Sequence, residues 1–341
     1  MSATGRAPTR TVISTEQLCS WLDQLALSSR LIAPVETAGV CLYRQVSTSQ
    51  AIAWNVSRPL LSLKEVFFPP TERLLTIHKS GRNIELEETF LDDPQVVFGV
   101  RPCDARGARL LDALFLDTPP ADPYYARRRE KTTLIGLACR EMGPGCFCTS
   151  TGGAPDSTDG LDLLLTEVTD GYALDLLTEK GRALLTGWSL PEFTGTSSAQ
   201  IRPSPAQFTI PPLESLLERF NDDYWQQISE RCLSCRACAY VCPTCRCFAV
   251  RDQEIRPGEF ERIRCWDACA GENYRRLAGG HRPRPAKAER LRNRFYCKFC
   301  YFPRQTGLVN TSACTGCGRC IEVCLAGVDI TEILADLGRL A

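Results

Sequence analysis

Two stretches, CLSCRACAYVCP (residues 232–243) and CTGCGRCIEVC (residues 314–324), decide the fold of the C-terminal part of this chain. Each has four cysteines in the spacing Cys-x-x-Cys-x-x-Cys-x-x-x-Cys. Three thiolates at this spacing can wrap one loop around an iron–sulfur cubane, and the fourth cysteine, at the start of a helix, points towards a second cubane. Together the two stretches predict a ferredoxin-like fold that holds two [4Fe–4S] clusters.

The two runs are expected to exchange their fourth cysteines. The predicted ligands of the first cluster are Cys232, Cys235, Cys238 and Cys324, and those of the second are Cys314, Cys317, Cys320 and Cys242. Zinc is the alternative, because two Cys-x-x-Cys pairs can bind one zinc ion, but zinc would leave the third and fourth cysteine of each run without a purpose. Leu325 follows Cys324 where bacterial ferredoxins often have proline. That proline shapes a turn and binds no metal, so the ligand prediction is unaffected.

Cysteine is the residue whose abundance is unusual here. The chain of 341 residues has 20 cysteines, and its basic and acidic residues balance at 40 each. The zero net charge gives no whole-chain reason to expect binding to nucleic acid or to an anionic membrane. The N-terminus lacks the apolar segment of a secretory signal, and no apolar run is long enough to cross a bilayer. We therefore expect a cytoplasmic protein without membrane insertion, in which clustered thiols indicate metal binding rather than disulfides.

The cysteines divide the chain into two parts. Six lie in the first 200 residues and fourteen lie between Cys232 and Cys324, and the Ser-, Thr- and Pro-rich stretch TGTSSAQIRPSPAQFTIPP (residues 194–212) separates the two sets. Such a composition is typical of a linker or surface loop. We predict an N-terminal α/β domain over residues 1–205 and a C-terminal dicluster domain over residues 206–341, with a long insertion at 243–313. The fold class is α/β or α+β.

Periodicity predicts the main elements of both domains. Apolar runs and helical spacing indicate two buried strands, one helix and a pair of strands in the N-terminal domain, at Gln95–Val100, Thr132–Ala138, Ala105–Leu116 and Leu161–Leu177. Asp170-Gly171 is a hairpin signal within the last of these. Two amphipathic helices are expected in the C-terminal domain, at Leu213–Glu230 and Asp329–Leu340.

Motifs beyond the cysteine runs carry a resemblance to a known family. They are CPTCRCF (242–248), CWDAC (265–269), AGGHRPRP (278–285), ERLRNRFYCKF (289–299), VVFGVRPCDARGARLLDALFLD (96–117), YYARRREK (124–131) and GLACREMGPGCFC (136–148). Together with CTGCGRC (314–320), they make residues 60–340 resemble the β-type subunit of cytoplasmic sulfhydrogenases, which are four-subunit, NAD(P)-linked [NiFe] hydrogenases. The resemblance implies a hetero-oligomer in which this chain relays electrons between a flavin- and NAD(P)-binding subunit and the small subunit beside the hydrogenase large subunit. The A subunit of anaerobic sulfite reductase shares this framework and gives the alternative terminal reaction.

Four N-terminal cysteines form a second predicted site. Cys103 and Cys139 each follow a predicted strand, and open α/β sheets place their sites beyond the carboxyl ends of strands. Cys146 and Cys148 lie in the adjoining Gly/Pro loop. These four thiols are expected to hold a third [4Fe–4S] cluster. The alternative is that they are small buried apolar residues, a common use of free cysteine.

The insertion contributes a further set of cysteines. Cys245, Cys247 and Cys269, with Cys297, could bind a fourth cluster or could pack around the second one. Four cysteines remain outside the ferredoxin pattern and these two sets: Cys265 and Cys300 are possible alternate ligands, whereas Cys19 and Cys41 resemble ordinary core or surface residues.

A basic run in the insertion leaves another function class open. From Arg275 to Arg304 there are ten Lys or Arg and one acidic residue. Basic stretches with aromatic residues can bind nucleic acid, which would suit a cluster-bearing nucleic-acid-binding or redox-sensing protein. Arginine near a cluster would instead raise its reduction potential or pair with a partner's carboxylates, and a solvated basic face is the simplest interpretation. We expect no nucleic-acid partner.

Motifs for catalysis and nucleotide binding are missing from the sequence. It has two histidines, His78 and His281, and neither a GxGxxG fingerprint nor a phosphate-binding loop. We therefore expect no catalytic centre, NAD(P) site or flavin site in this chain, which would act as an electron-transfer subunit.

Overall fold

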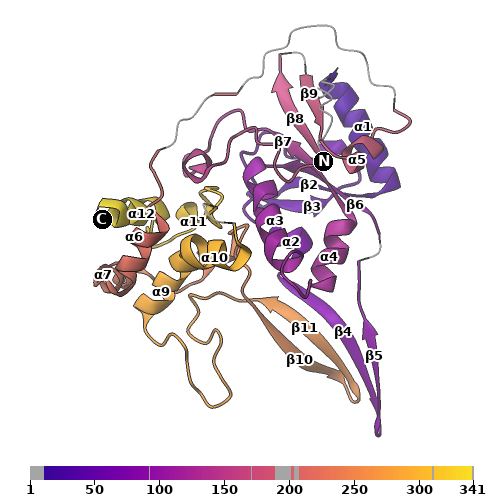
Figure 1. Ribbon diagram of the computed structural model, residues 1–341. Coiled ribbons are helices and arrows are strands. Elements are labelled where there is room, and N and C mark those ends of the chain that lie inside the picture. Colours follow the sequence, from indigo (N-terminus) through magenta and orange to yellow (C-terminus); the bar gives the residue numbers. More distant parts are fainter. Residues whose placement is uncertain are drawn as a thin grey trace.

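A seven-stranded mixed sheet forms the N-terminal half (Figure 1). The computed structural model describes residues 11–91, 93–169, 171–188, 201–202, 207–308 and 311–339. The strands lie in the order β1 (Thr11–Ile13), β9 (Gly171–Leu176), β8 (Leu163–Val168), β7 (Thr132–Leu137), β6 (Gln95–Val100), β2 (Arg30–Thr37) and β3 (Val40–Gln45). The four central strands β8, β7, β6 and β2 run parallel, and antiparallel strands flank them. Central parallel strands are buried on both faces, which explains why β6 is buried along its whole length.

Helices cover both faces of this sheet. Helix α1 (Thr15–Ser28) packs Leu18, Trp21 and Leu22 on one face. It begins at a capping box, in which Ser14 and Gln17 each bond the other's backbone N–H. Helices α2 (Lys64–Phe67), α3 (Pro102–Phe115) and α4 (Pro123–Glu130) pack on the opposite face, and a short helix α5 (Glu179–Ala183) follows β9. The 3₁₀ turns η1 (Ser49–Ala51) and η2 (Cys148–Thr151) lie in connecting loops.

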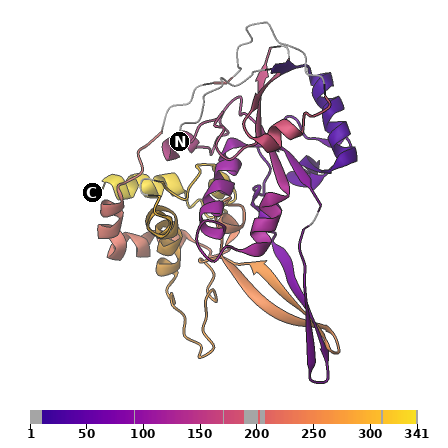
Figure 2. The same cartoon turned by 45° about the vertical axis from the view of Figure 1, so that its right-hand side comes forward.

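A four-stranded antiparallel arm projects from the body in both ribbon views (Figures 1 and 2). Its order is β10 (Phe248–Arg256), β11 (Glu259–Trp266), β4 (Thr71–Ser80) and β5 (Asn83–Glu88). The β11–β4 pairing joins the C-terminal insertion to the N-terminal half. At the base of the arm the buried Arg264 contacts Glu72, at 2.5 Å, and Asp122. The boundary near residue 205 stays a prediction, and strands from both sides of it share this sheet.

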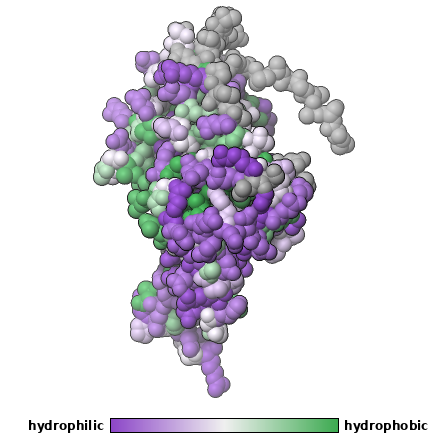
Figure 3. All heavy atoms as spheres, turned by 90° about the vertical axis from the view of Figure 1, so that its left-hand side faces the viewer, coloured by the Kyte–Doolittle hydropathy of each residue, from purple (hydrophilic) through white to green (hydrophobic). Residues whose placement is uncertain are grey.

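The rest of the C-terminal half is helical. Its elements are α6 (Leu213–Glu218), η3 (Arg219–Asn221), α7 (Tyr224–Arg231), α8 (Ala237–Tyr240), α9 (Lys287–Tyr296), the π-turn η4 (Cys297–Tyr301), α10 (Phe302–Thr306), α11 (Arg319–Glu322) and α12 (Ile330–Arg339). Their apolar side chains form a separate core that includes Trp225, Phe295 and Leu334. Phe147 from the N-terminal half also lies in this core. In Figure 3, which shows the face on the left of Figure 1, hydrophobic residues gather at mid-height of the body, whereas the surface below is mostly hydrophilic.

Most predicted elements of regular structure are confirmed. The predicted strands match β6 and β7, the helix at 105–116 lies within α3 apart from its last residue, and residues 161–177 form the antiparallel pair β8–β9. Asp170 of the hairpin signal lies outside the described residues. The single helix expected over Leu213–Glu230 was wrong, because the chain forms α6, η3 and α7 in its place. Asp222 is extended and its carboxylate accepts the Tyr224 N–H, which breaks the helix there.

Candidate iron–sulfur sites

The first cysteine loop (Cys232–Cys238) and the residues after α11 line one pocket, called site one here. Its four cysteines are Cys232, Cys235, Cys238 and Cys324. The loop follows α7 and leads into α8, while Cys324 comes from the other run, 86 positions beyond Cys238. The structure therefore brings together the four cysteines predicted for the first cluster. Their ligation of iron stays a prediction.

The second cysteine loop (Cys314–Cys320) and Cys242, two residues beyond the end of α8, line a second pocket, site two. Its four cysteines are Cys242, Cys314, Cys317 and Cys320. The short helices α8 and α11 pack against each other, so the cysteine that follows each helix reaches the pocket of the other run. This crossing is the arrangement that the spacing predicts.

The two loops repeat one backbone conformation. Ser234 and Arg236 have positive φ, 54° and 69°, and the equivalent Gly316 and Gly318 have φ of 64° and 76°. The Ser234 N–H donates to the Cys232 sulfur at 3.4 Å. In the second loop the Gly316 N–H likewise lowers the pKa of the Cys314 thiol, although burial dominates and raises that pKa to about 11. Backbone N–H groups aimed at sulfur suit the charge of a bound cluster.

Close packing explains why the second loop needs glycine. A Cβ on Gly318 would lie 2.2 Å from the Gly145 carbonyl oxygen, and one on Gly316 would lie 2.5 Å from Cys148 Cα. Phe147 also donates its N–H to the Gly316 carbonyl at 2.7 Å. The N-terminal loop that carries Cys146 and Cys148 thus lies directly on site two.

The cysteines of each pocket suit a cubane better than a single ion. Within the part of the chain that the structure describes, no three His, Cys, Asp or Glu side chains form a group that could hold one metal ion. A cubane differs, because each of its four thiolates binds a different iron atom. Lys298 gives a second test of the fit. Although buried, it donates to Cys242 Sγ at 3.1 Å, and its electrostatic neighbours include the thiols of Cys242 and Cys314 of site two. A buried cation at this place would offset the negative charge of a bound cluster.

The four N-terminal cysteines also lie together, in site three. Burial raises the pKa of the Cys103 thiol well above its usual range, with Cys317 and Cys139 among the thiols close enough to contribute. Burial likewise raises the pKa of Cys148 to about 11, and Cys146 and Cys139 add to it. Arg58 donates to Cys146 Sγ at 3.0 Å. Site three therefore adjoins site two, and its binding of a third cluster stays a prediction.

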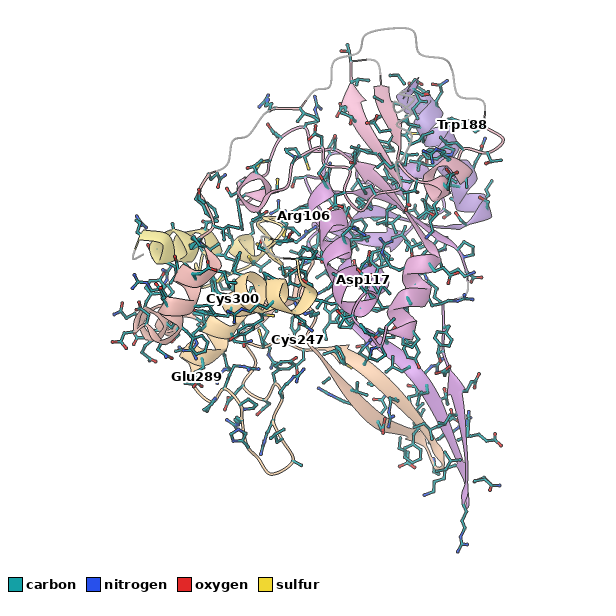
Figure 4. The ribbon with its side chains drawn as sticks, in the orientation of Figure 1. Arg106, Asp117, Trp188, Cys247, Glu289 and Cys300 are labelled. Atoms are coloured by element: carbon teal, nitrogen blue, oxygen red, sulfur yellow. The ribbon has the colours of Figure 1, made fainter. Side chains whose placement is uncertain are left out.

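The structure divides the fourth set of cysteines. The Cys245 thiol donates to Cys242 of site two and lowers the pKa of Cys242. Cys247 instead pairs with Cys269, which lowers the pKa of Cys247 to about 6, and Cys297 lies near Cys269. Figure 4 places Cys247 where β10 leaves the body. Three of the four cysteines thus form one group, and a fourth cluster there stays a prediction.

The remaining cysteines and the histidines lie outside these sites. Cys265 is on β11, where the Thr71 hydroxyl contacts its sulfur at 3.8 Å. Cys300 is buried in the helical core. His78 lies on the arm within 4.0 Å of two glutamates, and the His281 carbonyl accepts the Leu277 N–H. Cys19 is on α1 and Cys41 on β3.

A buried ion pair that the sequence did not indicate ties site two to α3. Arg319, which follows Gly318, donates to both carboxylate oxygens of Asp104 at 2.6 and 2.7 Å, and both side chains are buried. Arg319 also donates to the Pro59 carbonyl. Asp104 is next to Cys103, so one interaction holds sites two and three together. The two residues are 215 positions apart, and no local pattern could have paired them.

Comparison with known proteins agrees with this geometry. The family model of a 4Fe–4S dicluster domain matches residues 231–328, which include both cysteine runs. Sulfhydrogenase 2 subunit beta of Pyrococcus furiosus is 31% identical over 336 residues, covering 95% of this chain and 97% of that protein. The chain belongs to the sulfhydrogenase β-subunit family.

As a sulfhydrogenase β subunit with a dicluster domain, the chain is an iron–sulfur electron-transfer subunit that binds [4Fe–4S] clusters. The family resemblance predicted from the motifs is confirmed. No solved structure matches the chain. Within the described ranges, no helix combines the length and apolarity needed to cross a membrane.

Proposed function

We propose that this β subunit relays single electrons between a flavin- and NAD(P)-binding subunit and the small subunit of a [NiFe] hydrogenase. The observation that carries the proposal is the succession of cysteine pockets through the molecule. Site three adjoins site two, where Cys146 Sγ lies 3.7 Å from the Cys317 carbonyl oxygen. Site two adjoins site one through α8 and α11. Electron tunnelling falls steeply with distance, so adjoining clusters make a continuous path.

Site one, at one end of this path, is more exposed than site two in its middle, which supports a relay rather than storage. Cys235 of site one is exposed, whereas Cys242, Cys314 and Cys317 of site two are buried. Buried clusters exchange electrons with their neighbours, and an exposed cluster exchanges them with another protein. Clusters supply the one-electron chemistry when bound. The chain's own residues hold them and keep water away.

Metal analysis tests the cluster content. Anaerobically purified chain is expected to contain about eight iron and eight acid-labile sulfide atoms from sites one and two, and about twelve of each if site three is filled. Iron near zero with zinc in its place would contradict the proposal. Residues 1–205 produced alone that retain about four irons would support site three.

Co-purifying subunits test the terminal reaction. Nickel and a flavin in the complex isolated through this chain would support the hydrogenase relay. Sirohaem absorbance would identify an anaerobic sulfite reductase instead. Salt-sensitive retention of DNA or RNA by the pure chain would favour the nucleic-acid-binding alternative.

A further inference from the structure

Helix α9 and the π-turn η4 carry a row of basic residues that are buried. Arg290, Arg294 and Lys298 follow one another at intervals of four residues, so they lie along one side of this helical segment. They are 8%, 5% and 4% exposed. A buried charge is costly unless an opposite charge or hydrogen bonds compensate it, so each residue requires a partner.

Arg290 has an ordinary explanation. Its guanidinium donates to the carbonyl oxygens of Pro285 and Arg284, at 2.5 and 3.3 Å. These bonds hold the chain that leads into α9. Arg290 therefore serves the local fold.

Arg294 and Lys298 have thiols as their charged neighbours. Neither forms a salt bridge with a carboxylate among the residues that the structure describes. Lys298 donates to Cys242 Sγ at 3.1 Å and to Thr244 Oγ1 at 3.0 Å. The Nε of Arg294 is buried and has no hydrogen-bond partner within the described residues.

Arg294 lies between the two predicted clusters. Burial opposes its charge, but thiolates from both sites outweigh burial and raise its pKa well above the usual value; they are Cys238 of site one, and Cys320 and Cys242 of site two, with Cys245 beside them. Arg294 also lines the pocket of site one. Lys298 lines the pocket of site two. The row thus ends in one cation shared by both sites and one cation that belongs to site two.

We propose that Arg294 and Lys298 set the reduction potentials of the two clusters, with Arg294 acting on both and Lys298 on the cluster of site two. A cubane with four thiolates is negatively charged and gains one further negative charge on reduction. A buried cation nearby stabilises the reduced form more than the oxidised form, and low dielectric strengthens this effect. A cation shared by two clusters also reduces the repulsion between electrons held on both. This inference rests on the proposed function in that it requires both clusters.

The π-turn supports a functional role for this segment. The Phe302 N–H bonds to the Cys297 carbonyl, five residues back, and Lys298 lies within that wide turn. π-turns are rare and frequently lie at functional sites. Here the turn holds a lysine against a predicted cluster ligand.

Redox titration of the full-length, cluster-loaded chain, followed by low-temperature electron paramagnetic resonance, tests the proposal. Arg294→Gln is expected to lower both midpoint potentials, and Lys298→Met that of site two alone. In each case the ratio of reduced to oxidised cluster at a fixed solution potential should fall at least tenfold, which is about 59 mV for a one-electron couple. Cys235→Ser and Cys314→Ser assign the two signals to their sites.

Arg292 provides a matched control on the same helix. Its guanidinium stacks on the Phe220 ring at 3.7 Å and donates to the Phe220 carbonyl at 2.6 Å. Arg292→Gln removes one positive charge from α9, as Arg294→Gln does. Because Arg292 contacts Phe220 and lines neither pocket, its loss should leave both reduction potentials unchanged. Arg294→Lys keeps the charge and should recover most of the shift that Arg294→Gln causes.

The outcomes separate this inference from the proposed function. A wild-type chain without iron contradicts the proposed function, whatever the variants do. Iron-loaded Arg294→Gln and Lys298→Met chains with wild-type potentials overturn the inference and leave the relay intact. If Arg294→Gln does not retain iron, Lys298→Met decides alone: an unchanged potential at site two overturns the inference, and a lowered one supports it.

Discussion

The two cysteine loops share one sequence pattern and one backbone, yet their surroundings differ. The first loop lies at the surface, with Cys235 exposed and Leu233 63% exposed. The second loop is buried against the N-terminal half, whose Gly145–Cys148 segment contacts it directly. At matched positions the first loop has Ser234 and Arg236, and the second has glycine at both.

The comparison separates what a cluster requires from what the fold around it requires. Left-handed backbone occurs at the same two positions of both loops, so the cysteine spacing itself demands it. Glycine occurs only where the N-terminal loop approaches too closely for a Cβ. The next position of the two loops also differs because of the N-terminal half. The second loop has Arg319, which reaches Asp104 there, whereas the first loop has Ala237.

The largest expected effect comes from removing the fourth cysteine of either run, which lines the pocket of the other run. Cys324→Ala should remove the cluster of site one, whose other ligands lie in the first loop, because Cys324 lines that pocket. Cys242→Ala should remove the cluster of site two. Iron content should fall by about four atoms in each case, and electron paramagnetic resonance should show which signal is lost. Loss of the second-loop cluster in Cys324→Ala would show that the runs do not exchange ligands.

Removing the ion pair that anchors the second loop should have the next largest effect. Asp104→Ala leaves the Arg319 guanidinium buried without a counter-charge, and breaking a buried pair in this way typically costs about 3–5 kcal/mol. Denaturant unfolding of the anaerobic protein measures the change in the free energy of unfolding.

An exposed pair of the same chemistry serves as the control for that change. On the arm, Arg262 donates from two nitrogens to the two carboxylate oxygens of Asp252, and both side chains are nearly half exposed. Asp252→Ala should cost far less free energy of unfolding than Asp104→Ala, because water screens an exposed ion pair. Equal losses in Asp104→Ala and Asp252→Ala would mean that burial of the Arg319 pair contributes nothing.

Gly318→Ala should destabilise the contact between the second loop and the N-terminal half. Left-handed backbone costs a non-glycine residue about 1–2 kcal/mol, and overpacking against the Gly145 carbonyl adds about 1–3 kcal/mol. The matched change in the first loop is Arg236→Ala. Arg236 already has a Cβ in left-handed backbone, so this change loses only one surface ion pair with Asp267, and the free energy of unfolding should fall by about 0–1 kcal/mol. Thermal unfolding of both iron-loaded variants compares them, and a Gly318→Ala protein as stable as Arg236→Ala would refute the close approach.

The local part of this architecture could be predicted from the sequence. Strands β6 and β7 are continuous apolar runs, and the cysteine spacing anticipates which four thiols share each pocket. Both signals lie within a few residues of the feature that they predict. The dicluster part of the fold and the family follow from the same local motifs.

Non-local features could not be predicted in this way. The arm pairs β4 with β11 across almost 200 positions, and β5 (NIELEE) is exposed along its whole length. The Arg319–Asp104 pair depends on two elements meeting in space. Cys245 and Cys247 are two residues apart and were placed in one predicted set, yet Cys245 pairs with Cys242 and Cys247 pairs with Cys269.

The smallest expected effect sharpens the comparison most, since it tests the first loop alone. Ser234 has φ of 54° and donates its N–H to Cys232. Ser234→Gly relieves about 1–2 kcal/mol of left-handed strain but gives the unfolded chain about 0.4–1 kcal/mol of extra conformational freedom. Because these terms oppose each other, the free energy of unfolding should rise by about 0–1.6 kcal/mol, with iron content unchanged. A marked loss of stability would mean that the Ser234 side chain has a role beyond its backbone, and that the two loops differ in more than their contact with the N-terminal half.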